Sequence, residues 1–440
     1  MKKLLALVLS LNLMLGLFPV AASAVGADPE IVAALKANEN LPKTLEDPNL
    51  TMVFWMSWNG YRNNVAKNPA VYEASLEAKA AFEEIYGGTV DIVAVTWDQQ
   101  LQKCIDMQQA GTAPDLVLMY ESVFHNAVQQ GIVMNLDEYV TEQDYSYYPV
   151  SEENYMWKGS HYAVPIKPYL KHIVFNRTLF DYAGLDTPDM LYKNGEWTFE
   201  KFVELGRELT QDTDGDGETD QWGFSGYGDS MSHFIIANHG CLLDIDQANG
   251  KVTSGLKKPE TMEALTWLGE MVNSSNPMWM TEDGEMFGYF DNNALGMIVG
   301  KEIQDAQACP FEVGMVPYPA GPSGSTDEVY VYSQSWAVPT GSDNPEAAMA
   351  YVRMVNEVQK LKGDAMEKER YGVDADGDSV YDTIYAPDHK LITAYDKGVG
   401  DIFTIMATMM NYLNEDVPAS TIVERVEPTL NAEIEKAFSN

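Results

Sequence analysis

The chain of 440 residues has a hydrophobic fraction of 45% and a formal net charge of −38. Its length predicts two or three domains, and its apolar content suffices for a sizeable core. The acidic excess excludes a basic groove for nucleic acid and disfavours an anionic membrane surface as a partner.

The first residues have the pattern of a secretory signal peptide, which we assign to residues 1–24. Lys2 and Lys3 precede an apolar run, and small residues up to Ala24 offer a cleavage site. We therefore expect an exported protein, extracellular or periplasmic. The sequence around this cleavage site contains no cysteine that could carry a lipid anchor. Residues 25–47 form a short polar lead-in.

Strands and helices alternate in the next part of the chain. Buried strands are predicted for residues 51–60, 89–97 and 114–120, with a turn at the end of the first. Helices are predicted for residues 68–88, which end at a Gly-Gly pair, and for residues 98–113. This alternation predicts an α/β layer around a mostly parallel sheet.

Two extended crossings rich in proline or glycine follow, within residues 161–184 and 311–324. The second crossing leads into a predicted strand, residues 328–339. The remaining helical patterns cover residues 197–211, with Thr198 as the N-cap, and residues 258–274, 344–361 and 422–438.

The three cysteines are too few for a disulfide scaffold, and their odd number leaves at least one free thiol. Cys104 falls in a helical pattern and is most simply a small core residue. A Cys241–Cys309 bridge is a minor alternative, because sequence does not settle connectivity.

An acidic loop in residues 211–224 has the ligand spacing of a calcium site. Gly217 occupies its sixth position, where the chain turns sharply. Gly223 stands where a sensor carries its bidentate glutamate, and no exit helix is predicted, so the expected role of calcium is structural. A solvated acidic turn is the alternative. The expected ligands alternate along the loop: Asp212, Asp214, Asp216, Glu218 and Asp220.

A second acidic loop, residues 374–382, repeats this spacing less well because Ser379 replaces the turning glycine. Whether it binds a second calcium ion is left open. Its candidate ligands are Asp374, Asp376, Asp378 and Asp382.

No motif selects an enzyme. Nucleophile elbow, zinc-protease, Walker A and dinucleotide-binding patterns are all missing, and the six histidines are scattered. A glycoside hydrolase needs only two carboxylates at the right separation, so a secreted hydrolase stays open as an alternative.

Aromatic and amide groups recur where predicted strands end, which is where α/β sheets bind ligands. Aromatic faces pack on the C–H faces of sugars, and carboxylates and amides hydrogen-bond to hydroxyls. Trp55, inside its predicted strand, is expected in the core. Trp197, Trp222 and Trp267 are expected to be structural. The strand-end groups are Trp58, Asn59, Trp97, Asp98, Tyr120, Glu121, Ser122, Tyr169, Gln334 and Trp336.

Five segments, in this order, resemble one known family. They are "AGTAPDLVLMYESVFHNAVQQGIVMNLDEYV", "HYAVPIKPYLKHIVFNRTLFDYAGLDTP", "DNNALGMIVGKEI", "FEVGMVPYPAGPSG" and "VPTGSDNPEAAMAYVRMV". Together they look like the extracellular solute-binding proteins of bacterial ABC transporters, in the sugar-binding group that includes maltose-binding protein. The calcium loop followed by Trp222-Gly223-Phe224 also recurs in this group.

This resemblance implies a two-lobed, periplasmic-binding-protein-like α/β fold. Each lobe would hold a mostly parallel sheet flanked by helices, and crossing hinge strands would join the lobes. The first lobe would comprise residues 48–166 and 319–371. The second would comprise residues 167–318 and 372–440.

The implied function is that of an exported, monomeric receptor rather than an enzyme. It would bind a carbohydrate, expected to be an oligosaccharide, between the lobes and deliver it to an ABC permease. A peptide or another non-sugar solute is the alternative ligand. Lys301-Glu302 departs from the family, which often has an aromatic residue there. The implied cleft contacts are Trp58, Asn59, Trp97, Asp98, Tyr120, Ser122, Tyr169, Asp229, Lys301 and Trp336.

Overall fold

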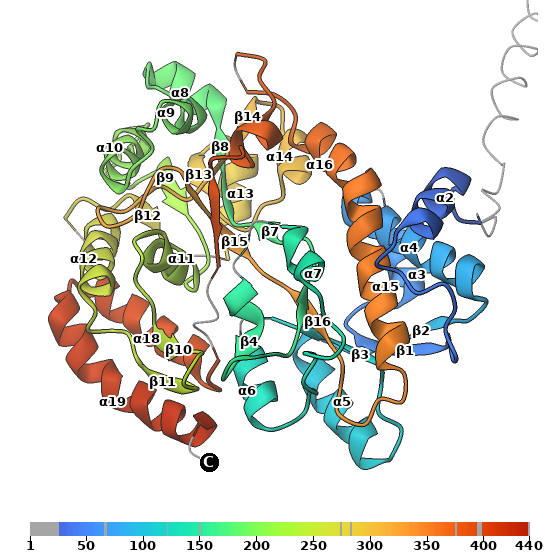
Figure 1. Cartoon of the computed structure of the whole chain (residues 1–440). Coiled ribbons are helices and arrows are strands. Elements are labelled where there is room, and N and C mark those ends of the chain that lie inside the picture. Colours follow the sequence, from blue (N-terminus) through green and yellow to red (C-terminus); the bar gives the residue numbers. More distant parts are fainter. Residues whose placement is uncertain are drawn as a thin grey trace, which may run out of the picture.

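The computed structural model describes residues 26–438 except 66–67, 121, 149, 151, 273–274, 282–283, 375 and 394–397. Two lobes, each built on a five-stranded sheet, lie side by side with a small three-stranded sheet between them (Figure 1). The predicted two-lobed α/β fold is therefore confirmed. The signal peptide assigned to residues 1–24 lies outside the described residues.

The first lobe holds the three strands predicted near the N-terminus, and they pair in parallel. β1 pairs with both β2 and β3, and β16 joins β3 in antiparallel orientation. The sheet order is β2 (Val90–Ala94), β1 (Leu50–Phe54), β3 (Leu116–Met119), β16 (Ser335–Ala337) and β6 (Val164–Pro165).

Helix α4 (Pro69–Tyr86) shows why the first lobe packs closely. Asn68 caps its N-terminus, and Gly87 ends it with a φ of +76°. Its buried stripe is mostly alanine, so α15 (Pro345–Val358), which also buries alanines, packs against it at short range. The other helices around this lobe are α2 (Pro29–Ala37), α3 (Trp58–Asn64), α5 (Gln100–Gln109), α6 (Phe124–Gln129) and α7 (Glu142–Ser146).

The second lobe is built on a mixed sheet. β9 pairs in parallel with β12 and β13, whereas β8 runs antiparallel to both β13 and β14. The sheet order is β12 (Trp279–Met280), β9 (Trp222–Ser225), β13 (Leu295–Ile298), β8 (His172–Asn176) and β14 (Val313–Pro317).

Helices α10 (Phe199–Leu209), α12 (Pro259–Val272) and α19 (Ala419–Phe438) of the second lobe were expected. Thr198 caps α10 as predicted, and α12 lies within its predicted range. The helices that were not expected are α9 (Pro188–Lys193), α11 (Ser230–Ala237), α13 (Met286–Asp291), α14 (Ile303–Gln307) and α18 (Ile402–Asn414). The other elements of this half of the chain include α8 (Arg177–Ala183), α17 (Val380–Ile384) and the hairpin of β10 (Leu243–Asp246) and β11 (Lys251–Ser254).

The chain passes between the lobes through the three-stranded sheet of β7 (Tyr169–Leu170), β15 (Glu328–Tyr332) and β17 (Lys390–Ile392). The second crossing lies later than the start of the predicted segment 311–324, because Ala320 still exchanges backbone hydrogen bonds with the second lobe. The lobe boundary placed before residue 319 is therefore too early. The predicted strand 328–339 is divided between β15 and β16, which belong to different sheets.

None of the three cysteines forms a disulfide, so the Cys241–Cys309 bridge is not present. Cys104 is buried in α5 as expected, and burial raises the pKa of its thiol to about 12. Among the described residues, no helix combines the length and apolar character that a bilayer span requires.

Candidate functional site

A cavity of about 500 Å³ lies between the lobes, which is within the size range of small-molecule sites. The first lobe contributes the end of β1 and the segment after β2. The second lobe contributes residues after β9 and β13, and α16 (Asp364–Tyr371) closes one side. The cavity thus lies beyond the carboxyl ends of parallel strands from both sheets, as expected for α/β folds.

Four large aromatic side chains line this cavity and stay open to solvent. The exposed fractions of Trp55, Trp97, Tyr169 and Tyr227 are 36%, 37%, 38% and 42%. The indoles of Trp55 and Trp97 meet edge to face, with ring centroids 6.1 Å apart. Because exposed aromatic surface is unfavourable in water, such a group marks a surface built to be covered.

Two tryptophans have the reverse of their expected places. β1 ends at Phe54, so Trp55 leaves the sheet at the cavity instead of lying in the core. Ser57 then caps α3, accepting from the Gly60 N–H at 3.2 Å, where a turn was predicted. Trp58 consequently packs on the core and donates its Nε1–H to the carbonyl oxygen of Val90 at 2.7 Å.

Two other expected contacts form a supporting layer beneath the cavity wall. Tyr120 packs under Trp97 at a centroid distance of 4.5 Å and donates to its carbonyl oxygen at 3.4 Å. Burial raises the pKa of Tyr120 to about 12, so its hydroxyl stays protonated at neutral pH. Trp336 is buried in β16 against Phe54, at 5.5 Å between centroids. Both hold the wall in place without lining the cavity.

Four more predicted residues lie away from the cavity. Asn59 is exposed on α3 and accepts from Arg62, and Lys301 turns toward Asp291, with 2.6 Å between Nζ and Oδ1. Asp98 and Ser122 do not line the cavity either. Of the ten predicted contacts, Trp97, Tyr169 and Asp229 do line it, and their ligand contacts remain a prediction.

Charged side chains cluster at α16, on one side of the cavity. Arg370 donates from Nη2 to a carboxylate oxygen of Glu302 at 2.7 Å, and both residues line the cavity. Lys167, in the first crossing, pairs with Asp364 and Glu367 of the same helix. Through these contacts, helix α16 links Lys167 of the first crossing to Glu302 of the second lobe.

His172, which is half-buried, also lines the cavity near this charged cluster. Its Nδ1 lies 3.2 Å from the carbonyl oxygen of Leu170, which only accepts, so Nδ1 carries the proton. Removal from water lowers the pKa of His172, which favours the neutral ring.

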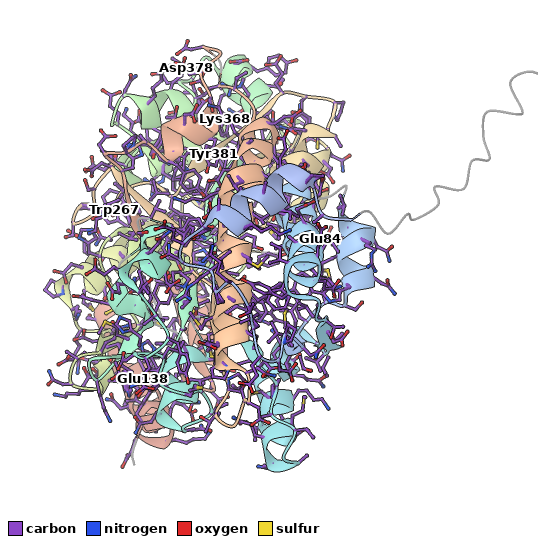
Figure 2. The ribbon with its side chains drawn as sticks, turned by 45° about the vertical axis from the view of Figure 1, so that its right-hand side comes forward. Glu84, Glu138, Trp267, Lys368, Asp378 and Tyr381 are labelled. Atoms are coloured by element: carbon purple, nitrogen blue, oxygen red, sulfur yellow. The ribbon has the colours of Figure 1, made fainter. Side chains whose placement is uncertain are left out.

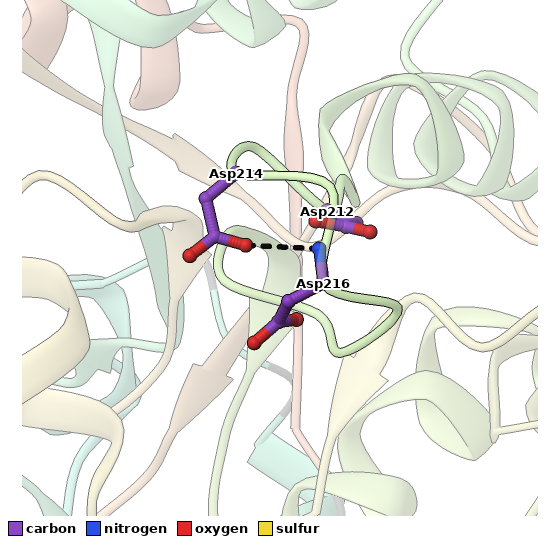
Figure 3. A group of neighbouring side chains, drawn as sticks. All are labelled: Asp212, Asp214 and Asp216. Atoms are coloured by element: carbon purple, nitrogen blue, oxygen red, sulfur yellow. Dashed lines mark hydrogen bonds between the residues drawn. The ribbon is translucent and has the colours of Figure 1, made fainter.

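The acidic loop between α10 and β9 brings three carboxylates together (Figure 3). Ligand oxygens of Asp212, Asp214 and Asp216 lie within 4.8 Å of one another. Asp212 accepts from the Gly217 N–H at 2.8 Å, and Gly217 has a φ of +96°, which favours glycine. The oxygen-only donor set and the glycine turn fit Ca²⁺.

The other two expected ligands of this loop lie outside the group of three. Asp220 accepts from the backbone and the hydroxyl of Thr213, at 2.8 and 2.9 Å, so it closes the loop. Glu218 occupies the position at which such loops supply a backbone carbonyl, so its side chain is not needed as a ligand.

A lysine lies in the second acidic loop. The Nζ atom of Lys193, from α9, lies 3.6, 2.9 and 2.5 Å from carboxylate oxygens of Asp374, Asp376 and Asp378. Hydrogen bonds to Asp378 and Asp376 raise the pKa of Lys193, so it stays charged. The fourth expected ligand, Asp382, pairs with Lys368 instead.

Sequence reasoning missed several residues that line the cavity, notably Trp55, His172, Tyr227, Glu302 and Arg370. The serine cap after β1 was a readable signal, because it predicts a helix start and so an earlier strand end. Nothing local marks Arg370 or Glu302, because their pairing joins segments 68 residues apart.

The sequence comparisons identify the family. The model of the bacterial extracellular solute-binding proteins matches residues 64–359. A binding protein of Brucella abortus (strain 2308) is 26% identical over 282 residues, which are 59% of this chain. The match spans 64% of the length of that curated relative.

Solved structures share the fold across most of both chains. An ABC substrate-binding protein from Listeria monocytogenes, in complex with cycloalternan, has a TM-score of 0.62 and 16% identity, with 89% of this chain and 99% of that chain covered. UgpB from Mycobacterium tuberculosis, in complex with glycerophosphocholine, has the same TM-score and identity, with 88% and 99% covered. Since the family model matches well over half of the residues, the chain belongs to the bacterial extracellular solute-binding proteins.

Proposed function

We propose that this protein is an exported receptor that binds a carbohydrate between its lobes and delivers it to an ABC permease. The observation that carries the proposal is the set of exposed aromatic side chains in a cavity that also holds carboxylate, amide and hydroxyl groups. Aromatic faces cover the C–H faces of a pyranose, and the polar groups pair with its hydroxyls.

Binding without catalysis is part of this proposal. A receptor needs closure of the two lobes around its ligand, and the crossings through β7, β15 and β17 supply the segments about which they can move. The cycloalternan complex of the Listeria relative supports a saccharide ligand. We further propose a monomer whose residues 1–24 direct export and are removed.

A structural calcium ion in the loop of Asp212 belongs to the same proposal. It would be held by Asp212, Asp214 and Asp216 and would fix the end of α10 to the start of β9. The three converging carboxylates and the Gly217 turn support it. The second acidic loop is not proposed as a calcium site, because Lys193 already supplies the positive charge there.

The test is a thermal-shift screen of the mature protein against neutral mono- and oligosaccharides, with peptides and glycerophosphocholine as non-sugar probes. A ligand that binds only the native state raises the melting temperature. We expect a shift with at least one saccharide and no new products after prolonged incubation. A shift confined to the non-sugar probes would contradict the carbohydrate assignment, and released sugar fragments would contradict a pure receptor.

A further inference from the structure

The Arg370–Glu302 ion pair lies at one side of the cavity. Arg370 lies on α16, which packs against α4 of the first lobe, whereas Glu302 immediately precedes α14, which packs against β14 of the second lobe. Figure 1 shows α16 leading from the end of α15 toward α14. The 2.7 Å contact therefore joins the two lobes at one side of the binding site.

The Arg370 side chain is only 8% exposed, yet its Nε–H has no hydrogen-bond partner among the described residues. The same holds for the buried Gln304 Nε2, and both residues line the cavity. Buried donors without partners are costly. Arg370 and Gln304 therefore offer two donors to a ligand at this end.

The charge of the cavity opposes an anionic ligand. Among the described residues, its lining includes the carboxylates of Asp229, Glu302, Asp305 and Glu367 and two permanent cations, Lys171 and Arg370. Glu302 already satisfies the charge of Arg370, the more buried partner of the pair. A ligand carboxylate would have to displace Glu302 and would meet its repulsion.

We propose that Glu302 determines specificity, making this site select neutral sugars over uronic acids. It acts through Arg370: the pair leaves Arg370 as a hydrogen-bond donor without free charge, suited to hydroxyl oxygens. This inference rests on the proposed carbohydrate function. Removing the charge of Glu302 frees the guanidinium, which then pairs with a sugar carboxylate in bidentate fashion.

The experiment compares the wild type with E302Q and R370Q against matched probes: glucose and glucuronate, galactose and galacturonate, mannose and mannuronate, and their dimers. Calorimetry gives affinities. We expect the wild type to bind neutral members, E302Q to gain about tenfold in uronate affinity relative to the neutral partner, and R370Q to lose affinity without that gain. Glu302 is 59% exposed, so E302Q should fold normally.

D382N is the matched control, because it breaks a surface ion pair to Lys368, which lies on α16 as Arg370 does. Figure 2 shows Lys368 and Tyr381 toward the same end of the molecule as Asp378. D382N should leave the selectivity at the wild-type value. In ligand-free protein, small-angle scattering should show a larger radius of gyration for E302Q and R370Q than for D382N, because only those two break the link between lobes.

The failures are distinguishable. If the wild type prefers uronates, or if E302Q keeps the wild-type preference, the role of Glu302 is overturned while a carbohydrate receptor stands. If no saccharide of either set binds the wild type, the proposed function fails and the selectivity with it. An unchanged radius of gyration in both E302Q and R370Q overturns the link between lobes.

Discussion

The two sides of the cavity differ in how they would hold a ligand. The aromatic wall of Trp55 and Trp97 offers apolar area that carries no charge. The ion-paired side of Arg370 and Glu302 offers hydrogen bonds whose charge is already balanced. The difference teaches that one wall should supply affinity by contact, while the other should supply discrimination between ligands of different charge.

The largest expected effect tests whether the aromatic wall consists of the exposed tryptophans rather than of every tryptophan near the end of β1. Trp58→Ala should lower the free energy of unfolding by about 3 kcal/mol, because it removes a packed indole and leaves the Val90 carbonyl without its donor. Trp55→Ala, at the cavity, should cost well under half of that. Urea denaturation of both variants without ligand measures this. Equal losses would remove the distinction between the two positions.

Trp97→Ala should cost binding rather than stability. The variant loses an aromatic face on which the sugar stacks. The binding of a neutral saccharide should weaken by roughly 2 kcal/mol, about thirtyfold in dissociation constant. Calorimetry measures the affinity, and thermal denaturation without ligand provides the control, where a near-normal melting temperature is expected. An affinity within threefold of the wild type would show that the aromatic wall is not the main contact.

The comparison of the two cavity walls assumes that changes far from the cavity leave ligand affinity unchanged. The calcium loop provides the control for this assumption. Chelation, or Asp212→Asn, should lower the melting temperature, since calcium that binds the native state stabilises it. Saccharide affinity should stay within twofold, because the loop does not line the cavity. A melting temperature that is unaffected by chelation would contradict the calcium assignment.

The smallest expected effect concerns salt. Raising the ionic strength should change the affinity for a neutral saccharide by less than about twofold, because stacking is uncharged and the Arg370 charge is balanced nearby. In E302Q the uronate affinity should fall clearly as salt rises. A steep salt dependence for neutral sugars would show that free charge, not contact, dominates binding.

The fold was largely predictable because its signals are local. Alternating strands and helices, the Thr198 cap and the Gly87 stop are each read within a few residues, and the structure has them where expected. Trp97 and Asp229 were also expected at the cavity. The positions of Trp55 and Trp58 were reversed because the predicted strand and turn run to residue 60, whereas β1 ends at Phe54 and α3 begins at Trp58.

The rest of the site depends on contacts that sequence spacing does not reveal. Glu302 meets Arg370 across 68 residues, and Lys193 enters an acidic loop 183 residues away, where it meets Asp376. In both cases the local motif gives charge but not the partner. The partner decides whether an acidic group binds metal, balances an arginine or repels a ligand.

The most direct test of the central claim is a crystal structure grown with the saccharide that gives the largest thermal shift. We expect a sugar ring against the Trp97 indole, with hydrogen bonds from residues of both lobes, including Arg370. A saccharide bound outside the cavity, or one held by a single lobe with the Trp97 face uncovered, would contradict the account.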